Sequence, residues 1–174
     1  MTLDELVGWL AKNNIGFYHF TSASNLPAIR THGLLSMREL RRLNIETVPG
    51  GNEISLAADL GCGMDNYVHL CLRKGHPMAF KATQEQRILD LRWLKVIPTV
   101  LLLPGVQVTD QVSNKNGVVP GSPLDLLPKA DWQVLYTRTD WNDPVIKERL
   151  ATAEKWEVLV PKQVAADYIR NLNG

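Results

Sequence analysis

Apolar residues occur in short runs that alternate with turn signals along the whole chain, without an internal repeat. Near the start, Leu6, Trp9 and Leu10 follow helical spacing, and Thr2 with Glu5 has the spacing of a capping box. This pattern predicts an amphipathic helix that ends near residues 13–14.

A strand is predicted directly after this helix, over residues 17–20. Because side chains alternate along a strand, Tyr18 and Phe20 are expected on an apolar core face and His19 on the other face. Hydroxyls and an amide follow at residues 21–25, where the strand gives way to a helix. This combination suits a nucleotide pocket, although a lone strand histidine is also common as a satisfied core residue.

Further elements follow from caps, turn residues and periodicity. Helices are predicted over 25–32, 37–43, 144–153 and 164–172, and strands over 67–72, 93–97, 106–109, 134–137 and 156–160. Residues 44–66 lack a clear period and contain several glycines, which predicts a long functional loop. Scattered strands with helices at both ends of the chain are typical of an α+β fold, here a split, mostly antiparallel β-sandwich around a cleft with peripheral helices.

The length and net charge of the chain limit the number of domains and the kind of nucleic-acid interface that it can have. A chain of 174 residues suffices for one domain with a sizeable core, so a single domain over 1–174 is expected. The formal net charge is only +1, so any nucleic-acid interface must be a local basic patch. Candidate basic residues are Arg38, Arg41 and Arg42 on one predicted helix, and Arg73 with Lys74 after a strand. A solvated helix face explains the first group equally well.

The cysteines and apolar runs indicate the compartment. Cys62 and Cys71 lack the spacing of metal ligands, so reduced thiols and no bound metal are expected. The chain has no secretory signal pattern, and the apolar run at 100–103 ends at Pro104. A soluble, cytoplasmic protein is therefore expected.

Glu157 is the second residue of interest, because its neighbours Trp156, Val158, Leu159 and Val160 are all apolar. Both faces of this strand are expected to be buried. A buried carboxylate is costly unless it is paired or hydrogen-bonded, so Glu157 is expected to have a partner. The alternative is a glutamate on a half-exposed edge strand.

Several short segments resemble, in order, the DarT-type DNA ADP-ribosyltransferase toxins. They are Tyr18–Thr21, Asn25–Ile29, His32–Ser36, Tyr67–Val68 leading to His76–Met78, Pro104–Val106 with Ser113–Asn114, and Trp156–Pro161. No segment is specific alone, but the ordered set is. The resemblance implies the ADP-ribosyltransferase fold around an NAD cleft, with NAD as a substrate, no metal, and single-stranded DNA as the acceptor.

The resemblance also implies roles for individual residues. Glu157 corresponds to the catalytic glutamate of the family. Breaking the bond between nicotinamide and ribose builds positive charge on the sugar, which a nearby carboxylate stabilises. His19 is expected to hold the adenosine-side ribose, Thr21 and Asn25 to support phosphates or ribose, and Tyr67 to stack on the nicotinamide.

The acceptor base is inferred from departures from the family pattern. In thymidine-modifying relatives, the segment after the tyrosine runs through proline and aromatics to arginine-serine-proline-methionine, and the preceding loop carries an arginine. Here residues 67–78 differ from that pattern, and residues 44–66 contain no arginine. These departures put thymine in doubt. The chain more closely resembles another branch of the family, which modifies guanine, and this resemblance favours guanine as the acceptor. His69 and Arg73 are expected to contact the edge of this base, and Asn52 and Arg38 are further substrate-binding candidates.

The resemblance implies a macrodomain antitoxin as a partner, in a toxin–antitoxin or phage-defence system. Two alternatives remain open. One is an ADP-ribosyltransferase acting on RNA, because a single-strand groove with stacking aromatics does not distinguish deoxyribose from ribose. The other is a catalytically silent NAD- or nucleic-acid-binding module of the same fold.

Overall fold

The structure is a computed structural model that describes residues 1–137 and 139–172. Its centre is an antiparallel sheet with the strand order β4-β1-β3-β6-β5. The strands are β1 (Phe17–Ser22), β3 (Tyr67–Cys71), β4 (Leu91–Val96), β5 (Gln107–Thr109) and β6 (Glu157–Pro161). A short second sheet pairs β2 (Leu34–Leu35) with β7 (Gln163–Val164). The predicted α+β class and antiparallel sheet are confirmed.

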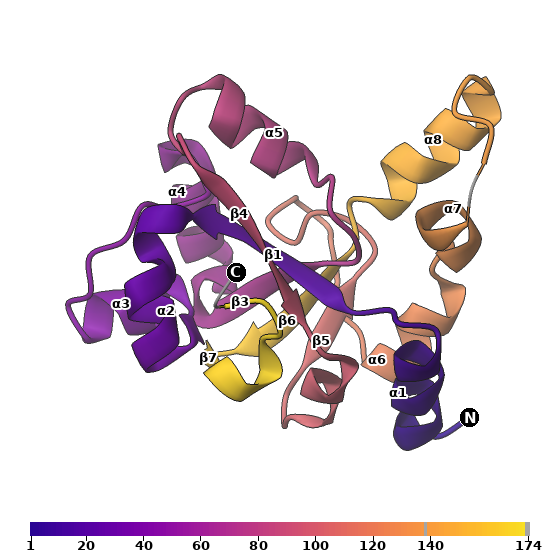
Figure 1. Cartoon of the computed structure of the whole chain (residues 1–174), viewed down its shortest axis with the longest axis horizontal. Coiled ribbons are helices and arrows are strands. Elements are labelled where there is room, and N and C mark those ends of the chain that lie inside the picture. The colour runs from indigo at the N-terminus through magenta and orange to yellow at the C-terminus, as the bar shows by residue number, and fades with distance from the viewer. Residues whose placement is uncertain (138, 173–174) are drawn as a thin grey trace.

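Helices gather at two opposite sides of this sheet (Figure 1). On one side lie α2 (Leu26–His32), α3 (Met37–Arg42), α4 (Glu53–Cys62) and α5 (Pro77–Gln84). On the other lie α1 (Leu3–Lys12), α6 (Pro123–Leu126), α7 (Trp132–Tyr136) and α8 (Pro144–Ala153). The Thr2–Glu5 capping box forms as predicted at the start of α1. Among the described residues, no helix is long and apolar enough to cross a membrane.

The core contribution of β1 differs from the prediction. Phe17 is fully buried in the core, whereas Tyr18 and Phe20 are half-buried. The Tyr18 ring lies under Lys74, and Phe20 packs near His76 at the cavity described below. The prediction that Tyr18 and Phe20 form the core face was therefore wrong by one residue of register.

Two predicted elements were wrong. Residues 134–137 were expected to form a strand, but α7 covers most of them, because the Asp131 side chain accepts from the Val134 N–H and caps this helix. Residues 164–172 were expected to form a helix, but Val164 pairs with Leu34 and Ile169 bridges Val96. Long-range pairing outweighs the local helical pattern there.

The predicted loop over 44–66 contains a helix in its second half. Asn52 accepts a hydrogen bond from the Ser55 N–H (2.9 Å) and starts α4 as its N-cap. Gly63 ends the helix in the left-handed conformation (φ 77°). Residues 45–51 remain irregular and line the main cavity together with α4.

Candidate active site

Glu157 lies at the start of β6, an interior strand between β3 and β5, and only 5% of the residue is exposed. The alternative that Glu157 lies on a half-exposed edge strand is therefore excluded. Antiparallel register pairs Glu157 with Cys71 of β3 and Thr109 of β5. The carboxylate contributes to the wall of a cavity that is also lined by β1, β3, α4 and residues 112–114.

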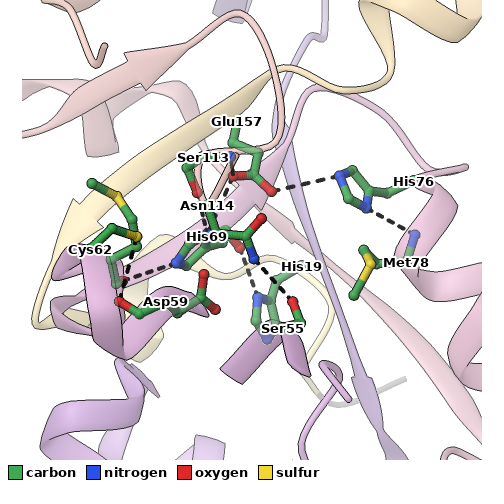
Figure 2. A network of polar contacts seen from close by, with 11 residues as sticks. His19, Ser55, Asp59, Cys62, His69, His76, Met78, Ser113, Asn114 and Glu157 are labelled. Atoms are coloured by element: carbon green, nitrogen blue, oxygen red, sulfur yellow. Dashed lines mark hydrogen bonds and ion pairs between the residues drawn. The ribbon is translucent and has the colours of Figure 1, made fainter. Parts of the chain in front are cut away.

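Both carboxylate oxygens of Glu157 have polar neighbours (Figure 2). Oε2 accepts from the Ser113 N–H (3.0 Å) and from Nδ1 of His69 (3.3 Å). Oε1 lies 3.6 Å from Nε2 of His76. A carboxylate has about four acceptor positions, so Oε1 keeps capacity for a further hydrogen bond.

His69 is protonated at neutral pH. Its Nε2 donates to the carbonyl of Met64 (3.1 Å) while Nδ1 donates to Glu157, so both ring nitrogens carry a proton. Burial alone would lower the pKa of His69, but the hydrogen bond and charge of Glu157 raise this pKa to about 9. Burial would likewise raise the pKa of Glu157, but the His69 hydrogen bond and charge lower it to about 2. The site therefore holds an imidazolium–carboxylate pair.

This pair predicts a pH limit for activity. The folded pKa of His69 is raised, so its stabilising contribution is complete below its ordinary value of 6.5 and is lost as the pH rises through about 9. The contribution of Glu157 is complete above 4.5 and is lost only as the pH falls through about 2. We expect the rate of transfer to fall as the pH rises through about 9, and this decline to be absent in the His69→Gln variant. A decline with the same midpoint in the variant would show that titration of His69 does not cause it.

His76 faces the Glu157 carboxylate with a neutral ring. Its Nδ1 accepts from the Met78 N–H (3.2 Å), so the ring proton is on Nε2. Burial lowers the pKa of His76, which favours the neutral form. Nε2 is buried and has no hydrogen-bond partner among the described residues, and it lies 3.6 Å from Oε1 of Glu157. His76 therefore both caps α5 and presents an N–H to Glu157.

Two substitutions separate these roles of His76. His76→Asn keeps an acceptor for the Met78 N–H but has no group at the Nε2 position, so we expect kcat to fall about tenfold at nearly unchanged Tm. His76→Gln places an amide near the Nε2 position but lacks the cap, so it should keep more activity and lose about 1 kcal/mol of stability. Kinetics and thermal unfolding of both variants check this. The reverse ranking in activity would show that His76 acts only as a cap.

His19 lines the same cavity from β1. Its Nδ1 donates to the carbonyl of His69 (3.0 Å), which leaves Nε2 as an acceptor. Burial lowers the pKa of His19, so the ring is neutral. The side chain is thus fixed in one tautomer and presents an acceptor suited to a hydroxyl donor.

Thr21 and Asn25 also line the cavity, but Asn25 is fully engaged within the protein. Its Nδ2 donates to Oγ1 of Thr21 (3.0 Å) and to the carbonyl of Val48 (2.8 Å), and its Oδ1 accepts from the Val48 N–H (2.9 Å). Asn25 therefore holds the irregular segment 45–51 against the cavity. A direct contact with a phosphate, as predicted, would require breaking these bonds.

Tyr67 and His69 reach the cavity from β3. The Tyr67 hydroxyl donates weakly to Gln107 (3.4 Å) and its ring borders the cavity. His69 was predicted to contact the acceptor base, but its two ring nitrogens are already used by Glu157 and Met64. Contact with an acceptor base through these nitrogens would require breaking one of these hydrogen bonds, so base contact by His69 stays a prediction.

The remaining predicted substrate-binding residues do not line this cavity. Arg73 lies near Glu154 (3.6 Å) and over the ring of Trp141. Asn52 caps α4, and Arg38 pairs with the buried Asp65 (2.9 Å). Their polar groups have structural partners that sequence spacing did not reveal.

Sequence reasoning did not identify several polar residues that line the cavity. His76, Ser113 and Asp59 come from three separate segments, and all three belong to the site. His76 and Ser113 were part of the family resemblance without an assigned role, and Asp59 lay in a segment read as a loop. The only sequence signals were a proline after His76, typical of a helix start, and Gly63 at the end of α4.

The comparison with protein families shows the family of the chain. A family model described as "ssDNA thymidine ADP-ribosyltransferase, DarT" matches residues 18–172. The chain belongs to this DarT family. The predicted family and the class of NAD-dependent single-stranded DNA ADP-ribosyltransferases are therefore confirmed. The family description names thymidine and does not support the predicted preference for guanine.

Solved structures share the fold at low sequence identity. "Thermosipho africanus DarTG in complex with ADP-ribose" is 18% identical with a TM-score of 0.67, covering 89% of this chain and 42% of that chain. "Thermus sp. 2.9 DarT in complex with ADP-ribosylated ssDNA" is 15% identical with a TM-score of 0.65, covering 89% and 78%. The same Thermus protein in complex with NAD+ is 18% identical with a TM-score of 0.62, covering 90% and 79%. A comparison with curated protein sequences gave no match.

Proposed function

We propose that this chain, as one catalytic domain over 1–174, transfers ADP-ribose from NAD to a base in single-stranded DNA. The observation that carries the proposal is the buried, ionised Glu157, held by Ser113 and His69 in a cavity that His19 also lines. Relatives of the same fold were solved with NAD+ and with ADP-ribosylated single-stranded DNA. A catalytically silent module has no need for a costly buried carboxylate in such a cavity.

The chemistry needs one anion and few other groups. The bond from the ribose C1′ to nicotinamide breaks, and its electron pair stays on the nicotinamide nitrogen. Glu157 stabilises the positive charge that develops on the sugar. Its Oε1 atom accepts a hydrogen bond from a ribose hydroxyl. Nε2 of His19 accepts a hydroxyl of the adenosine-side ribose. Thr21 and Tyr67 border the bound dinucleotide, with Tyr67 against the nicotinamide.

Thymine is the acceptor base that we propose, with guanine as the alternative that the sequence favoured. The family description names thymidine. The guanine prediction relied on His69 and Arg73, and their charged groups already have partners in Glu157 and Glu154. Unstacking a base costs least in a single strand, so duplex DNA should be a poor acceptor.

The biological setting follows from the family. We propose that the chain acts in the cytoplasm as the toxin of a toxin–antitoxin or phage-defence system. A macrodomain antitoxin that removes the modification is the partner we expect. Expression of the parent chain without such a partner should be harmful, whereas a Glu157 variant should be tolerated.

A panel of oligonucleotides tests the proposal. Single strands that each lack one base are incubated with the protein and NAD, and the mass of each oligonucleotide is measured for an added ADP-ribosyl group. We expect no addition without thymine, and unchanged addition without guanine. Loss of addition without guanine, with unchanged addition without thymine, would identify guanine as the acceptor base. Matched RNA strands are run beside the DNA, and modification of RNA alone would replace DNA as the substrate.

A further inference from the structure

Asp59 is a second carboxylate in the catalytic cavity, and the mechanism above does not use it. It lies on α4 and lines the cavity together with Glu157. Its Oδ1 is buried and has no hydrogen-bond partner among the described residues. Figure 2 shows Asp59 and Glu157 on either side of the His69 ring. An unpartnered buried carboxylate oxygen is costly, so its retention beside the reacting centre calls for a chemical role.

The position of Asp59 is well fixed. Asn52 caps the first turn of its helix, and the amide of Asn114 donates to the hydroxyl of Ser55 on the same helix (3.1 Å). Asn114 directly follows Ser113, whose N–H binds Glu157. Residues 113–114 therefore contact both Glu157 and the helix that carries Asp59, which gives Asp59 a defined place relative to Glu157.

The two carboxylates have opposite electrostatic environments. Burial raises the pKa of Asp59, while the charge of His69 and the amide of Asn114 oppose this shift. Glu157, in contrast, is held ionised by its hydrogen bonds and by His69. Two carboxyl groups whose environments push their pKa values apart commonly divide acid–base and electrostatic roles between them. Glu157 is a strong anion but a weak base, and Asp59 is the better proton acceptor.

We propose that Asp59 is the general base that removes the proton from the ring nitrogen of the acceptor base. The inference rests on the proposed function. As the acceptor nitrogen forms its bond to the ribose C1′, its N–H proton passes to the Asp59 carboxylate. The C1′ bond to nicotinamide breaks with its electron pair on the nicotinamide nitrogen, so neutral nicotinamide leaves. Asp59 then returns the proton to solvent, and no oxidant or further reactant is required.

A structural role for Asp59 predicts different behaviour. If Asp59 served only as a second countercharge to His69, its loss would disturb Glu157 and slow every reaction that begins with cleavage of NAD. If Asp59 acts on the acceptor, its loss slows transfer to DNA and spares cleavage of NAD with water as the acceptor. The ratio of these two rates therefore distinguishes the roles.

The experiment compares Asp59→Asn with the parent chain in two assays on the same preparation. Nicotinamide release from NAD without DNA reports cleavage, and mass addition to a single-stranded oligonucleotide reports transfer. We expect transfer to fall about 100-fold and release without DNA to stay within about threefold of the parent. Glu53→Gln, an exposed acidic position on the same helix, is the matched control and should change neither rate. Equal losses in both assays, or no loss of transfer, would overturn the inference.

A second variant covers the case in which Asp59→Asn folds poorly. Asp59→Ala leaves room for a small carboxylate, so added formate should restore part of the transfer rate without changing release in the absence of DNA. No restoration by formate in a variant with a parent-like Tm would also overturn the inference. Parent protein that releases nicotinamide but never modifies DNA would instead overturn the proposed function, and with it the assignment of Asp59 as the general base.

Discussion

Replacing Glu157 with glutamine is expected to reduce transfer of ADP-ribose about 1000-fold. Glutamine has the size of glutamate, so the packing of β6 persists and an amide oxygen remains to accept from the Ser113 N–H. The change removes the negative charge that faces the developing cation on the ribose. Single-turnover mass measurement on a single-stranded oligonucleotide gives the rate.

The matched control for this substitution is Glu154→Gln. Glu154 lies three positions before Glu157 but pairs with Arg73 outside the cavity lining (3.6 Å). The control should keep transfer within about twofold, and Glu157→Gln should keep its affinity for NAD within about threefold. A Glu157→Gln variant that transfers at a rate within a few-fold of the parent would show that Glu157 is not the catalytic carboxylate.

The second large effect is expected at His19 and concerns NAD binding. His19→Asn keeps a side-chain donor near the carbonyl of His69 and loses only the Nε2 acceptor that faces the cavity. We expect KM for NAD to rise about tenfold, which corresponds to about one lost hydrogen bond, with a smaller change in kcat. Titration with NAD at saturating oligonucleotide measures both constants. An unchanged KM together with a much lower Tm would identify His19 as a core histidine only.

The sequence predicted the burial of the Glu157 strand well because its signal is local. Glu157 is surrounded by apolar neighbours, and the structure buries it on an interior strand with polar partners. The capping box at Thr2 and the helix after Pro144 are likewise local features, and both form as expected. Short-range spacing is sufficient for such elements.

The partners of Glu157 were not predictable in the same way. Ser113 and His69 lie 44 and 88 positions from Glu157 in sequence, so only the tertiary fold brings them together. The same is true of Asn25, whose amide binds Val48, 23 positions away. In the sequence, a polar residue at a helix start suggests a ligand-binding group. Only the fold shows that its hydrogen bonds are already made to other groups of the protein.

The wrong elements have a related origin. Val164 and its neighbours have helical spacing, but pairing with Leu34 fixes them as a strand. Val134 has strand propensity, but the cap from Asp131 starts a helix. In both cases one specific contact outweighs an intrinsic preference that is worth less than about 1 kcal/mol per residue.

The most direct test of the central claim is the mass of a thymine-containing single-stranded oligonucleotide after incubation with NAD and the parent chain. The account predicts an added ADP-ribosyl group, at least one released nicotinamide for each group added, and loss of both products in Glu157→Gln. It is contradicted if the oligonucleotide mass stays unchanged under conditions in which NAD binds, or if Glu157→Gln modifies DNA as fast as the parent chain.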